Sequence, residues 1–348
     1  MPKDNFVKAG LLTLLLSFGL VLSYELWLRQ RGYSVSFDDD ERLWANQRSR
    51  VYQPIDEAVV FIGSSRIKFD LDIPTWEKET GTKAVQLAMV GSNPRPLLHD
   101  LAEDKNFKGR LIVDVTEVLF FNNAPPFQER PSKGISFYKK ETPSEKLSFK
   151  CNEMLESNLV LLDKDYFSAN AYLSRFHLKN RNGVNDNGPL PFPWEFDLTQ
   201  YDRQSKMHDR FVSDTNLQNQ VRMIWASLGR AMKSPPPSPA QLDSVLTAVK
   251  ADIDKIKSRG GDVLFIRTPS SGPFLAGEMQ NYPRQKYWDQ ILAKTGCAGI
   301  HFQDYDPLSH FNCPEFSHLS PADAKKFTKE LSQLIQQKGW KFPNSKTI

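Results

Sequence analysis

Short, continuous apolar runs recur along this chain and constrain its fold more than any other feature. The first is Ala58 to Ile62, which ends at Gly63-Ser64-Ser65. Runs of this kind suit strands that are buried on both faces, as in a parallel sheet. Comparable runs follow at residues 84–90, 111–115, 263–266 and 299–302. Each run predicts one strand of a parallel sheet.

Helices between these strands are predicted from capping signals. Ser238-Pro239-Ala240-Gln241 is a capping box with Pro at the first helical position, and Ser320-Pro321 opens the last helix in the same way. Gly260 and Gly339 end these two helices. Because strands and helices alternate, we expect an α/β fold, a three-layer α/β/α sandwich around a parallel sheet.

A long apolar segment lies near the start of the chain, from Ala9 to Leu28, and Glu25 is its one charged residue. As a helix, about 20 residues span about 30 Å, the hydrocarbon thickness of a bilayer. Arg29 lies four residues after Glu25 and can pair with it near the end of the segment. We therefore expect an N-terminal transmembrane helix, with a membrane anchor at residues 1–31 and a body at residues 32–348.

The flanking charges favour one orientation of this anchor. Lys3 and Lys8 precede the apolar segment and favour a cytoplasmic N-terminus, whereas Arg29 and Arg31 on the far side oppose it. The body is then expected outside the cytoplasm, in the periplasm or extracellular space. The alternative is a cleaved signal peptide with its cleavage site before Tyr24, although the apolar segment is long for one.

Charge and cysteine content bear on the possible ligands. Among 348 residues, 45 Lys and Arg stand against 41 Asp and Glu, without long basic runs, which does not favour nucleic acid as a partner. The three cysteines have no zinc-type spacing, so a structural metal site is not expected. No other cofactor is expected either. Outside the cytoplasm, Cys297 and Cys313 could pair and leave Cys151 free, which the sequence leaves open.

The alternation of strands and helices breaks between about residues 121 and 235, and this segment is expected to be an insertion or cap on the sheet. Four of its aromatic residues could line a carbohydrate surface: Trp194, Trp225, Tyr172 and Tyr201. Scattered aromatic residues are more often part of a local core, and we favour that interpretation.

Two short motifs carry residues suited to chemistry. Ser65 follows the first predicted strand, and parallel sheets bind ligands at the carboxyl ends of their strands. Glu315 and His318 stand three residues apart, just before the last helix. A carboxylate so placed can orient an imidazole whose other nitrogen activates a serine. Each motif alone has a plainer interpretation, since Ser64 or Ser65 could cap a helix and His318 could be an ordinary loop histidine.

Together the two motifs resemble the SGNH (GDSL-like) hydrolase superfamily. Its pattern has Gly-x-Ser after the first strand and Asp-x-x-His before the final helix. Gly63-Ser64-Ser65 is similar to the first block, with Ser64 in the usual Asp position, and Glu315-x-x-His318 is similar to the last, with Glu in place of Asp. Gly91 is similar to the second block, a glycine whose N–H joins that of Ser65 in an oxyanion hole.

The third block of the family, Gly-x-Asn-Asp, is absent, and the sequence after the third strand is Val113-Asp114-Val115-Thr116-Glu117. Asn93, Thr116 or Asn122 could supply the missing donor, and Asn93 is our choice; its plainer role is a turn asparagine. A classical α/β-hydrolase is a poorer match, because its Gly-x-Ser-x-Gly motif would need glycine at Ile67.

The resemblance implies an SGNH/flavodoxin-like sandwich and a serine esterase or O-acyltransferase that works through an acyl-Ser65 intermediate. Membrane-anchored members of the family pass acyl groups to envelope polysaccharides with a membrane-bound O-acyltransferase partner, so acyl esters and polysaccharide are the expected substrates. Arg267, and second to it Arg284, could bind an anionic part of the substrate or form a structural ion pair. The alternative function is a non-catalytic scaffold or a carbohydrate-binding partner in an envelope acylation complex.

Overall fold

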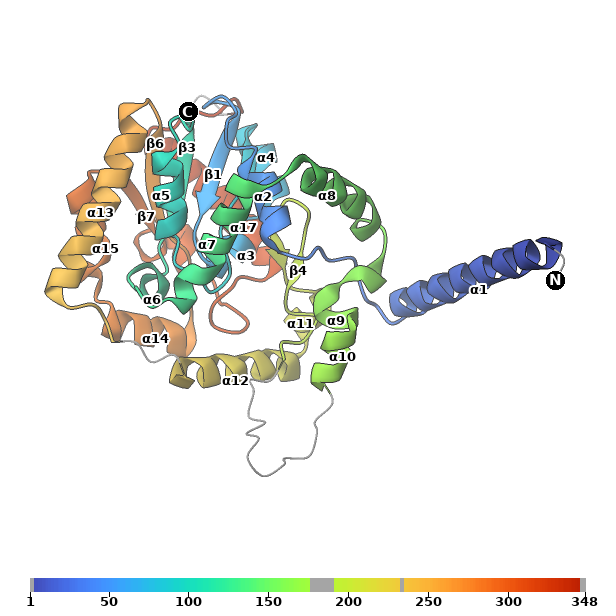
Figure 1. Cartoon of the computed structure of the whole chain (residues 1–348). Helices are drawn as coiled ribbons and strands as arrows, with labels where there is room; N and C mark the ends of the chain where they lie inside the picture. Colours follow the sequence, from blue (N-terminus) through green and yellow to red (C-terminus); the bar gives the residue numbers. More distant parts are fainter. Residues whose placement is uncertain (1–2, 176–190, 232–234, 345–348) are drawn as a thin grey trace. The chain divides into compact units, whose positions relative to one another are not determined.

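The computed structural model of the chain describes residues 3–175, 191–231 and 235–344 (Figure 1). The chain divides into two compact units. Unit 1 comprises the described residues of 1–38 and 142–186, and unit 2 comprises those of 39–141 and 187–348. The boundary between the units thus cuts through the segment that the sequence assigns to an insertion.

Unit 2 is built on one sheet of five parallel strands in the order β2-β1-β3-β6-β7. The strands are β1 (Ala58–Ile62), β2 (Lys83–Gln86), β3 (Arg110–Asp114), β6 (Asp262–Arg267) and β7 (Ala298–His301). In this order the chain winds outward in both directions from β1 and β3, so a switch point lies between the carboxyl ends of those two strands. All five expected strands are confirmed, although the run at 84–90 pairs as a strand only to Gln86.

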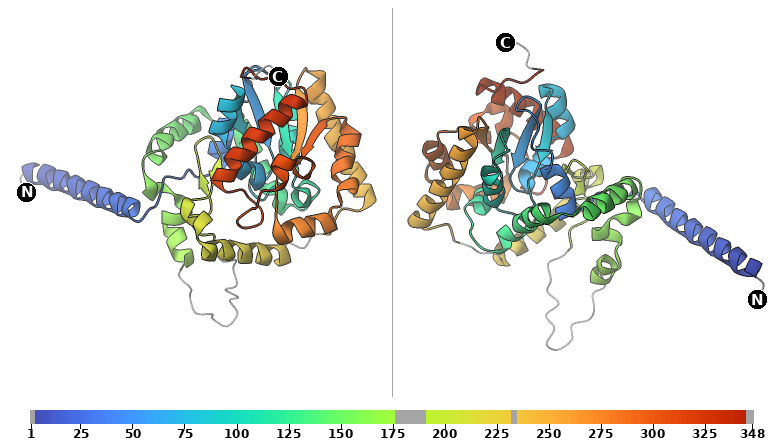
Figure 2. Two further views of the ribbon diagram at one scale, coloured as in Figure 1. Left: turned by 180° about the vertical axis from the view of Figure 1, so that it is seen from behind. Right: turned by 45° about the horizontal axis from the view of Figure 1, so that its top comes forward.

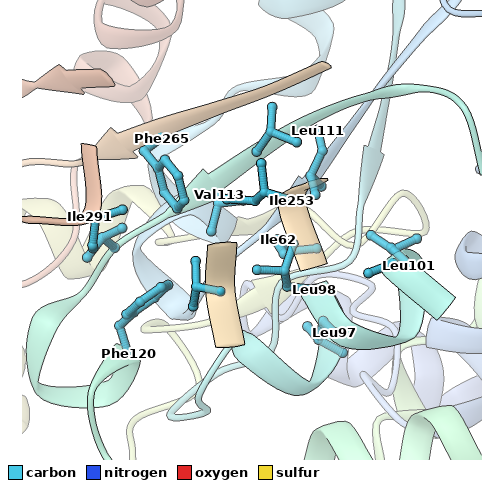
Figure 3. Close-up of a cluster of buried hydrophobic side chains, with 14 of the residues drawn as sticks. Ile62, Leu97, Leu98, Leu101, Leu111, Val113, Phe120, Ile253, Phe265 and Ile291 are labelled. Atoms are coloured by element: carbon cyan, nitrogen blue, oxygen red, sulfur yellow. The ribbon is translucent and has the colours of Figure 1, made fainter. Parts of the chain in front are cut away.

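Helices cover both faces of the sheet, as expected for an α/β sandwich. One face packs against α5 (Arg95–Glu103), α13 (Pro239–Ser258) and α15 (Trp288–Thr295). The other packs against α3 (Ser65–Asp70), α4 (Ile73–Thr80) and α17 (Pro321–Gln337), and α17 crosses the sheet in the left view of Figure 2. Figure 3 shows part of the first core, in which strand residues and helix residues interlock: Ile62, Val113, Phe265, Leu97, Leu98 and Ile253.

The predicted helix caps are confirmed. The Ser238 hydroxyl accepts a hydrogen bond from the backbone N–H of Gln241, whose side chain bonds back to the cap residue. The Ser320 hydroxyl accepts one from the N–H of Asp323 at the start of α17. These local bonds fix where the two helices begin, and so fix the loop that precedes α17.

All three cysteines are free thiols. Cys297 packs in the core on the α13 side of the sheet, whereas Cys313 packs on the α17 side. A disulfide between them, which the sequence left open, is therefore not formed, because the sheet separates the two sulfur atoms.

The segment between β3 and α13 is mostly helical. Its elements in unit 2 are α6 (Glu117–Phe120), α7 (Pro126–Lys140), α11 (Asp209–Ser213) and α12 (Thr215–Ala231), with a short antiparallel pair, β4 (Leu198–Thr199) and β5 (Ser205–Lys206). The sequence indicated neither this strand pair nor α12. Residues 176–190 and 232–234 of the expected insertion lie outside the described residues.

Other short elements complete unit 2. They are α2 (Glu41–Arg48), α14 (Gly272–Asn281), η2 (Arg284–Lys286), η3 (Phe302–Asp304) and α16 (Asp306–Ser309). The α2 helix contacts α7, and α14 follows β6 at the carboxyl edge of the sheet.

Unit 1 contains the long N-terminal helix α1 (Lys3–Gln30). From Asn5 to Gln30 it is long and apolar enough to cross a membrane, by length and composition, and its most apolar stretch is unburied. The unit also holds α8 (Pro143–Glu156), η1 (Val160–Leu162), α9 (Lys164–Phe167) and α10 (Ala169–Arg175). The expected N-terminal apolar helix is confirmed.

Gly63, between β1 and Ser64, allows a close approach that predicts the effect of a substitution. A Cβ atom at this position would lie 2.6 Å from Ile67 Cγ2 and 2.7 Å from Asp114 Cβ. We expect Gly63→Ala to destabilise the protein by about 1–3 kcal/mol, because neither the helix nor the strand can yield without repacking.

Thermal unfolding of the full chain in detergent would measure this effect. Gly277→Ala is the matched control, because no atom lies within 4 Å of its added methyl group and alanine favours the α14 helix by about 0.5–1 kcal/mol. Equal melting temperatures for the two variants would contradict the prediction.

Candidate active site

Three of the residues singled out from the sequence form one hydrogen-bonded chain. Ser65 Oγ lies 2.8 Å from His318 Nε2, and His318 Nδ1 lies 2.8 Å from Glu315 Oε1. When Nδ1 carries the proton and donates it to the carboxylate, Nε2 is free to accept the hydroxyl hydrogen of Ser65. We call these three residues the relay.

The relay is buried except at its serine. Glu315 is 0% exposed and His318 1%, whereas Ser65 is partly exposed. Ser65 is the first residue of α3 and follows the carboxyl end of β1 after Gly63 and Ser64, and His318 comes from the loop before α17. The nucleophile candidate is thus accessible while its proton acceptor is shielded from water.

The Glu315 carboxylate is held by three donors. Oε1 accepts the backbone N–H of His318 at 2.7 Å as well as the imidazole, and Oε2 accepts the indole N–H of Trp225 at 2.5 Å. Phe316, between Glu315 and His318, has a φ of +80°, a left-handed conformation that a bulky residue rarely adopts. The tight turn and the three donors hold the glutamate carboxylate against the imidazole of His318.

Helix α12 supplies side chains that the sequence analysis did not connect with this loop. Besides Trp225, Arg222 donates to the carbonyl of Pro314, and its guanidinium lies 4.5 Å from the centre of the Phe316 ring. One turn of α12 therefore contacts the loop at three successive residues. Val221 and Ile224 are buried and three residues apart, which is helical spacing, so the sequence could have predicted this helix. It could not have predicted that the helix contacts the loop of Glu315 and His318.

Aromatic side chains surround the imidazole of His318. The ring centres of Phe69, Phe196 and Trp225 lie 4.4, 5.8 and 6.2 Å from that of His318. These rings limit the rotation of the histidine and keep water from its far side. Trp225 thus contributes to a local core, as favoured from the sequence.

Backbone donors lie at the start of α3. Ser64 is the residue that precedes the helix, but its hydroxyl bonds to Thr116 Oγ1 at 2.8 Å and makes no capping bond. The N–H groups of the first helical turn, that of Ser65 included, are therefore left without a side-chain cap. Thr116 itself is buried, where it contacts Ser64 and, at 3.4 Å, Asp114 Oδ2.

Gly91 follows a segment that runs beside β1. Beyond the end of β2, Leu87 N–H donates to the carbonyl of Phe61 at 2.8 Å and Met89 N–H to that of Gly63 at 3.2 Å. This parallel register carries Gly91 to the same edge of the sheet as Ser65. Gly91 has a φ of +61° and is exposed, so its backbone can approach a ligand without obstruction by a side chain.

Asn93 occupies a buried turn. Its side-chain Nδ2 donates to the carbonyl of Asn122 at 2.7 Å, and its Oδ1 accepts the backbone N–H of Arg95 at 2.9 Å. These are the contacts of a turn asparagine, the plainer of the two roles considered from the sequence.

Arg267 lies in a buried network of charges. Its Nε is 3.2 Å from the Glu117 carboxylate, and its Nη2 pairs with Glu278, which also binds Arg66, the residue after Ser65. Burial opposes ionisation of Glu278, but the two guanidinium groups outweigh burial and hold its pKa at about 2. The Arg267 guanidinium thus forms ion pairs within the protein, with Glu117 and Glu278. Arg284 likewise pairs with Asp289 and Asp304.

The remaining candidate residues make contacts that do not involve Ser65, His318 or Glu315. The Trp194 ring packs 4.8 Å from that of His208, and the Tyr201 hydroxyl accepts a hydrogen bond from Asn46. Among the described residues, a group with the ligand types and spacing of a metal site is His99, Glu103 and Asp252. Lys255 forms ion pairs with both of its carboxylates, which accounts for their proximity.

Comparison with known proteins gives no relative from which a role can be taken. No protein-family model matches the chain, and no curated protein does. Among solved structures, the crystal structure of tagatose-6-phosphate ketose/aldose isomerase from Escherichia coli is 13% identical, with 94% of this chain and 92% of that chain covered and a TM-score of 0.15.

The buried carboxyl of Asp114, at the end of β3, predicts a pH effect on stability. Burial raises its pKa from 3.8 to about 6, although Arg66 and Arg267 act to lower it. In the folded state this group therefore keeps a proton that the unfolded chain has lost, so its contribution favours folding at low pH. That contribution fades as the pH rises from 3.8 to about 6.

We expect Asp114→Asn to remove this dependence. Relative to the wild type, the variant should gain about 2 to 3 kcal/mol between pH 4 and pH 7.5, whatever its constant cost in lost hydrogen bonds. Chemical unfolding of both proteins at the two pH values would measure the gain. A difference that does not change with pH would refute the assignment.

Proposed function

We propose that this protein is a membrane-anchored serine esterase or O-acyltransferase of the SGNH type, with its body outside the cytoplasm, acting on acyl esters of envelope polysaccharide. The observation that carries the proposal is the Ser65–His318–Glu315 relay, in which only the serine is partly exposed. The position of Ser65, at the switch point of a doubly wound sheet, also supports it, because such sheets bind ligands there.

In the first step, Ser65 Oγ attacks the carbonyl carbon of an ester while His318 Nε2 takes its proton. The negative charge that develops on the carbonyl oxygen is stabilised by the backbone N–H groups of Ser65 and Gly91. The Glu315 carboxylate stabilises the imidazolium that forms. The tetrahedral adduct then expels the alcohol, which leaves with the proton from His318, and an acyl-Ser65 ester remains.

In the second step, the neutral imidazole takes a proton from an acceptor, whose oxygen attacks the acyl carbonyl. Collapse of the second adduct returns the proton to Ser65 Oγ and releases the acyl group on the acceptor. Water as acceptor gives an esterase, and a sugar hydroxyl gives a transferase. No metal or organic cofactor takes part in this scheme.

The resemblance to membrane-anchored SGNH proteins favours a sugar hydroxyl over water as the acceptor, and so favours a transferase. Such proteins receive acyl groups with the help of a membrane-bound O-acyltransferase partner and pass them to polysaccharide. The apolar helix α1 supports this part of the proposal, because it can hold the chain at a bilayer where acyl groups are exported.

The function is tested with a short-chain nitrophenyl ester and the full chain in detergent. Release of nitrophenol is followed with and without oligosaccharide acceptors, and the masses of the products are measured by mass spectrometry. Acylated sugar identifies a transferase, and free acid alone identifies an esterase. Exposure of the body to protease in intact cells, compared with spheroplasts, tests its location; protection from protease in spheroplasts contradicts an extracytoplasmic body.

We expect Ser65→Ala and His318→Ala each to lower turnover by about 10³-fold or more, because each removes a member of the relay. Ser65→Ala should not lower the melting temperature by more than a few degrees, since Ser65 is partly exposed and its loss creates no large cavity. His318→Ala should lower it further, because the change leaves a cavity among aromatic rings and removes a donor from the buried Glu315 carboxylate. If both variants keep full activity in cells, the protein is instead the non-catalytic scaffold.

The bond from Trp225 to Glu315 predicts a kinetic effect of its own. Trp225→Phe keeps the ring in its aromatic surroundings but removes the indole N–H, so the carboxylate loses one of its three donors. We expect kcat to fall by about 10- to 100-fold with little change in KM, because Trp225 acts through Glu315 and not on the substrate.

Trp194→Phe is the matched control for this measurement. It makes the same replacement in the same segment, at a ring that packs on His208 and not on the relay. Equal kcat values for the two variants would show that the indole bond has no role in the reaction.

A further inference from the structure

Glu25, the one charged residue in the apolar segment of α1, ties this helix to the rest of unit 1. Its carboxylate accepts hydrogen bonds from the backbone N–H groups of Val160 and Leu161, both at 3.0 Å, and pairs with Arg29 at 2.7 Å. Arg29 in turn donates to the carbonyl of Asn158 at 2.8 Å. The turn that leads from α8 into η1, residues 157–161, is therefore hydrogen-bonded to the last two turns of α1, and we call it the fastened turn.

A second contact lies at the same level of α1. The hydroxyl groups of Tyr24 and Tyr172, on α10, are 2.5 Å apart. Leu28 and Val160 are each 1% exposed, so the side chains next to these hydrogen bonds are buried. Within unit 1, both the end of α8 and the helix α10 thus lie beside residues 24–29 of α1.

These contacts set the depth of the turn relative to a bilayer. If α1 crosses the bilayer over Ala9 to Leu28, residues 24–29 lie at the end of the span, next to the headgroups, and within about 8 Å of one another along the helix axis. Tyr24 and Trp27 are the residue types that favour this level. Whatever is bonded to these residues must lie there too.

Large apolar side chains are exposed next to this fastened turn. On the last turn of α8, Met154 is 68% and Leu155 51% exposed, and on α10 Leu173 is 66% exposed. On α1, within the residues that hold this turn, Leu26 and Trp27 are about half exposed. Such a surface is unfavourable in water and favourable at the boundary between headgroups and acyl chains.

We propose that the end of α8 and the helix α10 rest on the bilayer, with Met154, Leu155 and Leu173 inserted at the headgroup boundary of the leaflet from which α1 emerges. The occupant of this surface is lipid, because hydrogen bonds hold the surface beside residues 24–29, where α1 leaves the bilayer. The proposal rests on the membrane anchor of the proposed function and is independent of the reaction at Ser65.

Depth-dependent quenching of a fluorophore tests this contact in the full chain. The protein is placed in nanodiscs of phosphatidylcholine that contain lipid with a quencher near the headgroup. The fluorophore is attached to Met154→Cys in a Cys151→Ser background, where Cys297 and Cys313 are buried. We expect it to be quenched at least about five-fold more than the same fluorophore on Ser144→Cys, an exposed position of the same unit at the other end of α8.

A third label, on Leu16→Cys in the middle of α1, separates the anchor from the surface contact. Quenching at position 16 by lipid with a quencher deep in the acyl chain, without quenching at position 154, would leave the anchor in place and overturn the proposal. No quenching at either position would overturn both. Since the nanodiscs contain no other protein, quenching at position 154 identifies lipid as the occupant.

A second variant measures the contribution of the apolar side chains. With the fluorophore on the native Cys151, one turn before Met154, the double change Met154→Ser and Leu155→Ser should lower the quenching about two-fold. Unchanged quenching would mean that these side chains do not insert, which also overturns the proposal.

Discussion

The carboxylate of Glu315 is the group on which the geometry of the site depends. It is fully buried, and a buried carboxylate is stable only when its oxygens are bonded. Here the donors are the imidazole and backbone N–H of His318 and the indole of Trp225. Two of these bonds fold the loop back on itself and give the imidazole its direction, and the third connects the loop to α12. Removal of any one would leave the buried carboxylate with fewer donors in an apolar setting, so the loop, the helix and the histidine are held in one arrangement.

A second set of buried charges supports the relay from the side of the sheet. Arg66 follows Ser65 directly, pairs with Glu278, and donates to the hydroxyl of Ser317 at 3.3 Å. Glu278 also binds Arg267 at the end of β6. The residues next to Ser65 and His318 in the chain are therefore tied to α14 and to the sheet, which limits how far the serine and the histidine can separate. Burial of these ions costs free energy, and their mutual bonds offset that cost only in this geometry. We regard the network as a means of fixing position more than of adding stability.

The two units differ in what their charges do. In unit 2, paired charges lie beneath the carboxyl edge of the sheet and orient the candidate catalytic groups. In unit 1, the carboxylate of a single glutamate within an apolar helix accepts hydrogen bonds from two backbone N–H groups and pairs with an arginine. In both units a buried carboxylate joins segments that lie far apart in the sequence, 90 residues for Trp225 and Glu315 and 135 for Glu25 and Val160. Long-range order in this protein therefore depends on a few carboxylates together with the apolar cores.

Features determined by neighbouring residues could be predicted from the sequence alone. The five apolar runs indicated the strands, Ser238 and Ser320 indicated the helix starts, and the spacing of Glu315 and His318 indicated a hydrogen-bonded pair, because each depends on periodicity or on bonds within one turn. The tertiary structure alone decided that Trp225 and Arg222 contact the loop that carries Glu315 and His318, and that Arg267 pairs with Glu117 and Glu278. It also decided that Asn93 holds a turn and that the sheet separates Cys297 from Cys313. These outcomes depend on which helix packs against which loop. That choice is made by the burial of whole surfaces and the pairing of distant charges, which no local pattern of residues encodes.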